Sequence, residues 1–66
     1  MSVAKIIEID SSSKKSFEDA IQKGVKKAAE SVSNITGAWV NEQKVVIKND
    51  EIVLWRVNMK VSFVLK

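Results

Sequence analysis

The chain has 66 residues, 45% of them apolar, and its 11 Lys and Arg against 8 Asp and Glu give a formal net charge of +3 at pH 7. It has no Cys and no His, so a core that is marginal at this length has neither a disulfide nor a structural zinc site to support it. Tyr is missing as well, and without these three residue types the commonest general bases and strong nucleophiles are excluded. We therefore expect a protein that is not an enzyme and that is stabilised by oligomerisation.

Targeting and membrane-spanning segments are not expected. The first ten residues alternate apolar with charged side chains and contain no apolar core of a signal peptide. No apolar run approaches the ~20 residues that a membrane span needs. The sequence therefore predicts a cytoplasmic protein without a membrane partner.

The predicted elements follow the order strand, helix, strand, strand. Residues 4–10 (AKIIEID) predict a short strand, and the polar residues 11–15 connect it to the helix. Ser16 is a favourable N-cap, and Glu18 and Asp19 place negative charge in the first turn, where the helix dipole stabilises it.

The helix is expected to extend for about 18 residues, or roughly 27 Å, and to end before Gly37, where the chain must turn back. Its apolar side chains recur every three or four residues and form one stripe that packs against a sheet. The stripe consists of Phe17, Ile21, Val25 with its neighbour Gly24, Ala28 and Val32.

Residues 37–48 and 52–66 predict a long antiparallel hairpin with its turn at residues 49–50 (ND). Every odd position from 53 to 65 is large and apolar, which is the alternation of a strand with one buried face. A strand of this length extends over about 43 Å, whereas a compact monomer of this size has a diameter of about 28 Å. The strand overshoots its own subunit, so the pattern predicts a homo-oligomer.

The turn fixes the register of the hairpin and defines an outer face, directed away from the helix. Near the turn this face is apolar, which indicates an interface between subunits. Glu42 and Lys44 fall on the core face in this register, and a β-bulge near Gln43 would move them outward. The core-face pairs include Val46 with Val53, and the outer-face pairs are Ile47 with Ile52, Val45 with Leu54, Gln43 with Arg56, Asn41 with Asn58 and Trp39 with Lys60.

The polar part of the outer face is the candidate ligand site. An indole plane beside amides and a guanidinium is suited to a flat ligand with polar or anionic edges. Alternatively, the tryptophan packs at a subunit interface and the polar side chains form its rim. A second tryptophan, Trp55, belongs to the alternating apolar row and is expected in the core or at an interface. The candidate site consists of Trp39, Asn41, Gln43, Arg56, Asn58 and Lys60.

Two other groups of charged residues have alternative interpretations. A set of lysines could bind phosphate, but no aromatic residue lies among them, and a solvated helix face explains them, so nucleic acid is not an expected partner. Carboxylates could bind a metal together with backbone carbonyls, but no loop has calcium-ligand spacing, and no metal ligand is assigned. The lysines are Lys14, Lys15, Lys23, Lys26 and Lys27, and the carboxylates are Asp10, Glu42, Asp50 and Glu51.

Four stretches, VAKIIEID, SSSKKSFEDAIQKGVKKA, NITGAWVNEQ and VLWRVNMKVSFVL, resemble the dodecins, and SFEDAI and KVSF are the most specific parts. The resemblance covers nearly all of residues 1–66. It implies a single α+β domain of βαββ order, in which a three-stranded antiparallel sheet is partly wrapped around one helix. It also implies a hollow sphere of twelve subunits that binds and stores a flavin, either riboflavin or FMN.

The resemblance further implies where a flavin would bind. Flavin-binding dodecins stack the ring on a tryptophan three residues after the asparagine that closes the helix, and Gly37 occupies that position here. They bond the edge of the ring through a glutamine, which is replaced here by Arg56. Trp39, two residues further along the same face, is expected to supply the stacking surface instead. This chain is also similar to a branch of the family that lacks that tryptophan and that glutamine. The similarity implies an alternative function, either a flavin-free structural shell or a calcium-binding protein.

Overall fold

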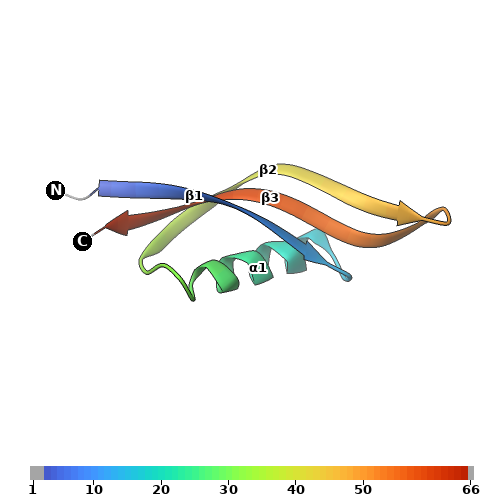
Figure 1. The fold of residues 1–66 in the computed structure, drawn as a ribbon, viewed down its shortest axis with the longest axis horizontal. Coiled ribbons are helices and arrows are strands. Elements are labelled where there is room, and N and C mark those ends of the chain that lie inside the picture. The colour runs from blue at the N-terminus through green and yellow to red at the C-terminus, as the bar shows by residue number, and fades with distance from the viewer. Residues whose placement is uncertain (1–2, 66) are drawn as a thin grey trace.

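The fold is a three-stranded antiparallel sheet with one helix on one of its faces (Figure 1). A computed structural model describes residues 3–65. The elements are β1 (Val3–Ser13), α1 (Phe17–Ala28), β2 (Ile35–Lys48) and β3 (Glu51–Leu65). The strand order is β1-β3-β2, so the last strand of the sequence is the central one. This arrangement confirms the predicted βαββ fold.

Helix α1 begins where the sequence predicts and ends earlier than expected. The Ser16 hydroxyl accepts a hydrogen bond from the Asp19 backbone N–H at 3.0 Å, which caps the N-terminus. The helix has 12 residues rather than about 18. It is followed by a tighter turn, in which the N–H groups of Glu30 and Ser31 bond to carbonyls three residues back, and then by residues 31–36 (SVSNIT), which have low helix propensity. The chain turns at Asn34, whose φ is 63°. Gly37 therefore does not end the helix but lies inside β2, and Val32 lies beyond the helical stripe to which it was assigned.

Small residues bring α1 close to the sheet. The fully buried helix positions are Ala20, Gly24 and Ala28, one turn apart, whereas the larger apolar side chains beside them are half-buried. Ala20 packs in the core against Val57 and Met59 of β3. The predicted stripe is therefore confirmed, but its closest approach to the sheet is made by alanine and glycine.

The sheet is much longer than the helix that covers it. The molecule measures 52 × 19 × 14 Å, and its radius of gyration is 13.6 Å, against about 11 Å for a compact domain of this length. Helix α1 contacts β1 and β3, and the β2–β3 hairpin extends past its end (Figure 1). Accordingly the middle of the alternating row on β3 is buried, whereas Val53 and Leu65 are 38% and 47% exposed. The predicted overshoot of the strand is confirmed.

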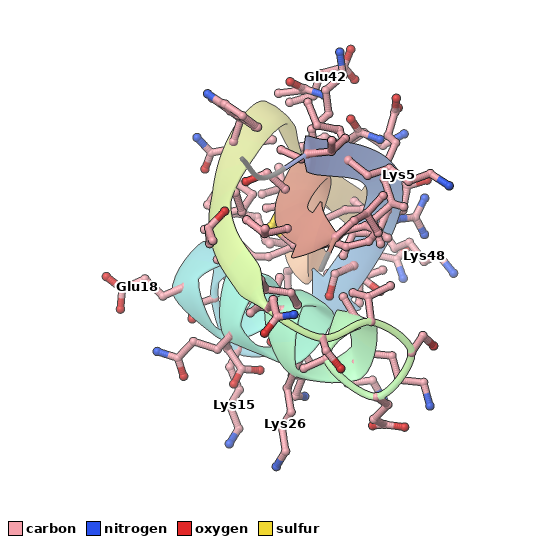
Figure 2. All side chains as sticks on the ribbon, turned by 90° about the vertical axis from the view of Figure 1, so that its left-hand side faces the viewer. Lys5, Lys15, Glu18, Lys26, Glu42 and Lys48 are labelled. Carbon is pink, nitrogen blue, oxygen red and sulfur yellow. The ribbon has the colours of Figure 1, made fainter. Side chains whose placement is uncertain are left out.

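The hairpin turns at Asn49 and Asp50, as predicted, and both residues have the positive φ of a type I′ turn, 52° and 63°. A β-bulge interrupts the ladder at Asn41, between the pairs Val40–Met59 and Glu42–Asn58. The bulge moves Glu42 onto the outer face, opposite to the helix side on which Lys15 and Lys26 lie (Figure 2). A bulge near Gln43 that turns the charged residues outward is thus confirmed.

The bulge also overturns four of the predicted pairs. Glu42 rather than Asn41 lies opposite Asn58. Gln43 lies opposite Val57 rather than Arg56, and Lys44 takes its place beside Arg56 on the outer face. Val45 lies opposite Trp55 rather than Leu54, and Val46 lies opposite Leu54 rather than Val53. The physical reason is that one extra residue on β2 shifts every following side chain to the other face, until a second irregularity between Val46 and Ile47 restores the register.

Residues 11–13, expected as a connection, extend β1 and anchor the start of α1. The Ser11 hydroxyl donates to the Ala20 carbonyl at 2.7 Å. The buried Ser13 hydroxyl donates to Asp19 Oδ2 at 2.6 Å and accepts from the backbone N–H of Lys15 at 2.9 Å. The serines are therefore in the strand because their side chains satisfy polar groups at the first turn of the helix.

The close approach of α1 to the sheet predicts that Gly24→Ala destabilises the fold. An added Cβ would lie 2.5 Å from Met59 Cε and 3.0 Å from Ser11 Cβ, inside a packed core. Overpacking costs about 1–3 kcal/mol, which exceeds the gain in helix propensity of about 1 kcal/mol. We expect a lower free energy of unfolding in urea at fixed protein concentration.

The matched control for this substitution is Gly37→Ala, in the open part of β2. The nearest atom that its Cβ would meet is Ser62 Oγ at 3.6 Å, so the free energy of unfolding should be unchanged or higher by less than about 1 kcal/mol. Equal effects of the two substitutions would contradict the importance of close packing at Gly24.

Asp19 predicts a dependence of stability on pH. The hydrogen bond from Ser13 and the ion pair with Lys23, at 3.2 Å, hold the pKa of Asp19 below its usual value of 3.8. Because folding lowers this pKa, the carboxylate stabilises the fold above the unfolded pKa, and this contribution is lost as the pH falls through the folded pKa. Asp19→Asn should lower the melting temperature at neutral pH and flatten its decline in acid. Parallel melting curves of both proteins against pH would contradict this role.

Candidate functional site

The outer face of the sheet is built from rows of three side chains, one from each strand. Alternate residues of the central strand β3 point outward, and each is flanked by its partners on β1 and β2. Starting from the end nearer to the termini, the rows are Ile6–Ser62–Gly37, Glu8–Lys60–Trp39, Asp10–Asn58–Glu42 and Ser12–Arg56–Lys44.

Asn58 organises the row of carboxylates. Its amide nitrogen donates to Asp10 Oδ1 at 2.9 Å and to Glu8 Oε2 at 3.0 Å. Its amide oxygen accepts from Asn41 Nδ2 at 3.0 Å, and Glu42 lies directly opposite on β2. Both N–H groups of the Asn58 amide are used within the sheet, so this side chain fixes the carboxylates in place rather than offering a free donor to a ligand.

A groove of ≈ 410 Å³ crosses this part of the outer face. Its walls are residues 10–12 of β1 and 42–44 of β2, and its floor is residues 56–58 of β3. The volume lies in the usual range for small-molecule sites, about 300–1,000 Å³. The structure therefore places three residues of the predicted site, Gln43, Arg56 and Asn58, around one concave surface. Glu42 and Lys44, which the bulge moves outward, line the same surface.

Trp39 lies outside this groove, in the neighbouring row opposite Lys60, and its side chain is 55% exposed. Lys60 and Arg56 are four residues apart on β3, about 13 Å. Because Trp39 lies beside Lys60, Trp39 and Arg56 are on the same face but do not contact each other. Gly37, one row further along, has no side chain on this face, and an added Cβ would be in ordinary contact with Ser62 Oγ at 3.6 Å. The predicted site is therefore divided into an exposed aromatic platform and a charged groove.

The other predicted site residues have distinct positions. Asn41 is the bulge residue and reaches the outer face through its bond to Asn58. Gln43 lines the groove from a position in register with the buried Val57, so it no longer faces Arg56 as expected. Trp55 is half-buried, opposite Val45.

Strand β1 contributes side chains to the outer face that the sequence did not predict there. Glu8, Asp10 and Ser12 alternate along β1 and meet β3 on its outer face, opposite Lys60, Asn58 and Arg56. The alternation of polar residues on this strand is visible in the sequence. Only the strand order, with β3 between β1 and β2, shows that these residues join the site.

Two of the five lysines that could bind phosphate form ion pairs within the helix region. Lys23 pairs with Asp19 at 3.2 Å, and Lys27 pairs with Glu30 at 3.4 Å, both on exposed surface. Such pairs are typical of a helix face in water. Within residues 3–65 no group of three or more carboxylates is arranged to hold a metal ion. In the same range no helix has the length and apolar character needed to cross a membrane.

Residues 3–66 match the model of a protein family described as Dodecin. A curated relative, calcium dodecin of Mycobacterium tuberculosis, is 36% identical over 63 residues, which are 96% of this chain and 89% of the relative.

Solved structures agree with this match. A dodecin from Streptomyces davaonensis superposes with a TM-score of 0.94 at 26% identity and covers 98% of this chain and 96% of its own. The structure of the M. tuberculosis calcium dodecin gives a TM-score of 0.84 at 33% identity, with 97% and 91% of the two chains covered.

Proposed function

This chain belongs to the dodecin family, and from that membership and the geometry of its outer face we propose that it is a non-enzymatic, oligomeric protein that binds and stores a small ligand. A flavin, riboflavin or FMN, is the first ligand to test. The proposed assembly is the hollow sphere of twelve subunits typical of the family, and the proposed compartment is the cytoplasm.

Trp39 is the observation that carries this proposal. A large aromatic side chain that is 55% exposed on a rigid strand offers a flat stacking surface. Gly37, on the same face and two residues away, is exposed and has no side chain that would obstruct a planar ring beside the indole. Lys60, directly opposite, supplies a cationic group for polar or anionic edges of the ligand.

Calcium is the second candidate ligand. Two carboxylates, those of Glu8 and Asp10, converge on one amide nitrogen of Asn58. Because residues 3–65 of one chain hold no group of three carboxylates, the remaining ligands would come from water or another copy of the chain. Carboxylate oxygens are the ligands that Ca²⁺ prefers, and the curated relative is named calcium dodecin. In this alternative the outer face binds an ion, and the protein is a flavin-free shell.

The tip of the hairpin supports the proposed assembly. Ile47 and Ile52 lie opposite one another and are 59% and 49% exposed. Val53 beside them is 38% exposed, and the helix does not reach this end of the sheet (Figure 1). Apolar side chains gathered at a projecting strand end favour burial against another copy of the chain.

Titration with FMN and riboflavin tests the ligand. We expect tryptophan and flavin fluorescence to be quenched at micromolar concentrations and the quenching to be lost in Trp39→Ala, because the stacking surface is removed. Trp55→Phe is the matched control, since Trp55 is half-buried and away from the outer face, and it should retain flavin binding. If flavins cause no quenching and the melting temperature is higher with calcium than with EDTA, calcium would be favoured as the ligand.

The double substitution Ile47→Glu with Ile52→Glu tests the assembly. It places two like charges opposite one another at the hairpin tip, so association through this surface should fail and the particle mass should fall in light scattering. The control is Lys48→Gln with Glu51→Gln, the neighbouring pair of the same hairpin, which leaves the apolar surface intact. An unchanged mass of the glutamate variant would show that the tip is not a subunit interface.

A further inference from the structure

The groove of the outer face has opposite charges at its two ends. One row presents Arg56 and Lys44 with the hydroxyl of Ser12, and the adjacent row presents the carboxylates of Asp10 and Glu42 on either side of Asn58. The two rows are two residues apart along each strand, about 7 Å. A positive end and a negative end are thus fixed at a set spacing on one concave surface.

The positive end is unfavourable for the isolated sheet. Lys44 and Arg56 lie directly opposite one another on neighbouring strands, and like charges in that relation destabilise a sheet. Within residues 3–65 the ion pairs present involve Lys23 and Lys27, not these two cations. No carboxylate of the described residues neutralises this like-charge pair, which lines a groove. Such locally unfavourable arrangements are expected at functional sites.

The carboxylates at the negative end form no ion pair within residues 3–65. Asp10 is held by Asn58 at 2.9 Å, and Glu8 is held by the same nitrogen at 3.0 Å. Each carboxylate keeps further lone pairs that can accept hydrogen bonds. An ammonium group brings three donors and a positive charge to such acceptors.

We propose that this groove binds a zwitterion, a small molecule with a carboxylate at Arg56 and Lys44 and an ammonium group about 7 Å away at Asp10 and Glu42. The planar guanidinium of Arg56 can bond a carboxylate through two parallel hydrogen bonds, which sets the orientation of the ligand. This inference rests on the proposed function, because both assume that the outer face of the sheet binds the ligand. It uses the groove and not the Trp39 platform, and it specifies a ligand class other than a flavin or a metal ion.

A series of zwitterions of increasing length tests the spacing between the two charged rows of the groove. Glycine, β-alanine, γ-aminobutyrate and ε-aminocaproate carry the same two charges at growing separation, and hexanoate and hexylamine each carry one of them. By saturation-transfer NMR on the assembled protein, we expect ε-aminocaproate to bind about tenfold or more tightly than either singly charged compound, because both charged ends are engaged. Glycine, which is too short for both rows, should bind no more tightly than the singly charged compounds.

Two double variants separate the ends of the groove. Arg56→Gln with Lys44→Gln should reduce ε-aminocaproate binding to the level of hexylamine, and Asp10→Asn with Glu42→Gln should reduce it to the level of hexanoate. The control is Glu18→Gln with Lys26→Gln, which removes one charge of each sign on the helix side, far from Glu42 (Figure 2), and it should leave binding unchanged.

Three outcomes would overturn the proposal. One is equal binding of ε-aminocaproate and the singly charged compounds, and another is unchanged binding in both groove variants. The third is a change of particle mass in the groove variants by light scattering, because the groove would then be filled by another copy of the chain. Trp39→Ala should retain ε-aminocaproate binding, so a failure of the flavin site and a failure of the zwitterion site give different results.

Discussion

The packing of a short helix against the centre of a long strand governs the rest of this structure. A helix of 12 residues covers about 18 Å, whereas the molecule is 52 Å long. The buried row of β3 is therefore limited to the part beneath α1, and the same alternating apolar pattern continues into solvent at both ends. The mismatch of lengths leaves the hairpin tip apolar and exposed. The outer face of the sheet is open because the helix packs on the other face (Figure 1).

Small residues make this packing possible. Ala20, Gly24 and Ala28 form the closest contact of α1 with the sheet, and hydrogen bonds from Ser11 and Ser13 fix the end of β1 to the first turns of the helix. The two elements are thus joined by close backbone approach and by polar contacts, in addition to the apolar side chains of Phe17 and Ile21 that pack against the same core. A chain of this size can build a stable centre in this way while much of its surface is available for association or binding.

One bulge residue decides the chemistry of the outer face. Without the extra residue at Asn41, Glu42 and Lys44 would point toward the helix side, where charged groups are costly. With it, they join Arg56 and Asn58 around the groove, and Asn41 itself bonds to Asn58. The dodecin from S. davaonensis has the same fold at 26% identity. The backbone can therefore be retained while most of the side chains change.

The sequence by itself determined the order of the elements, the N-cap, the turn at residues 49–50 and the overshoot of the last strand, because these follow from local propensity and from the period of apolar residues. It also indicated a bulge, since charged residues at 42 and 44 conflicted with a buried face. Only the tertiary structure decided which residues share the groove. The position of β3 between β1 and β2 brings Asp10 and Ser12 beside Asn58 and Arg56, and the bulge exchanges Gln43 for Lys44. Strand order and register are set by contacts between segments far apart in the chain, and a local pattern does not contain them.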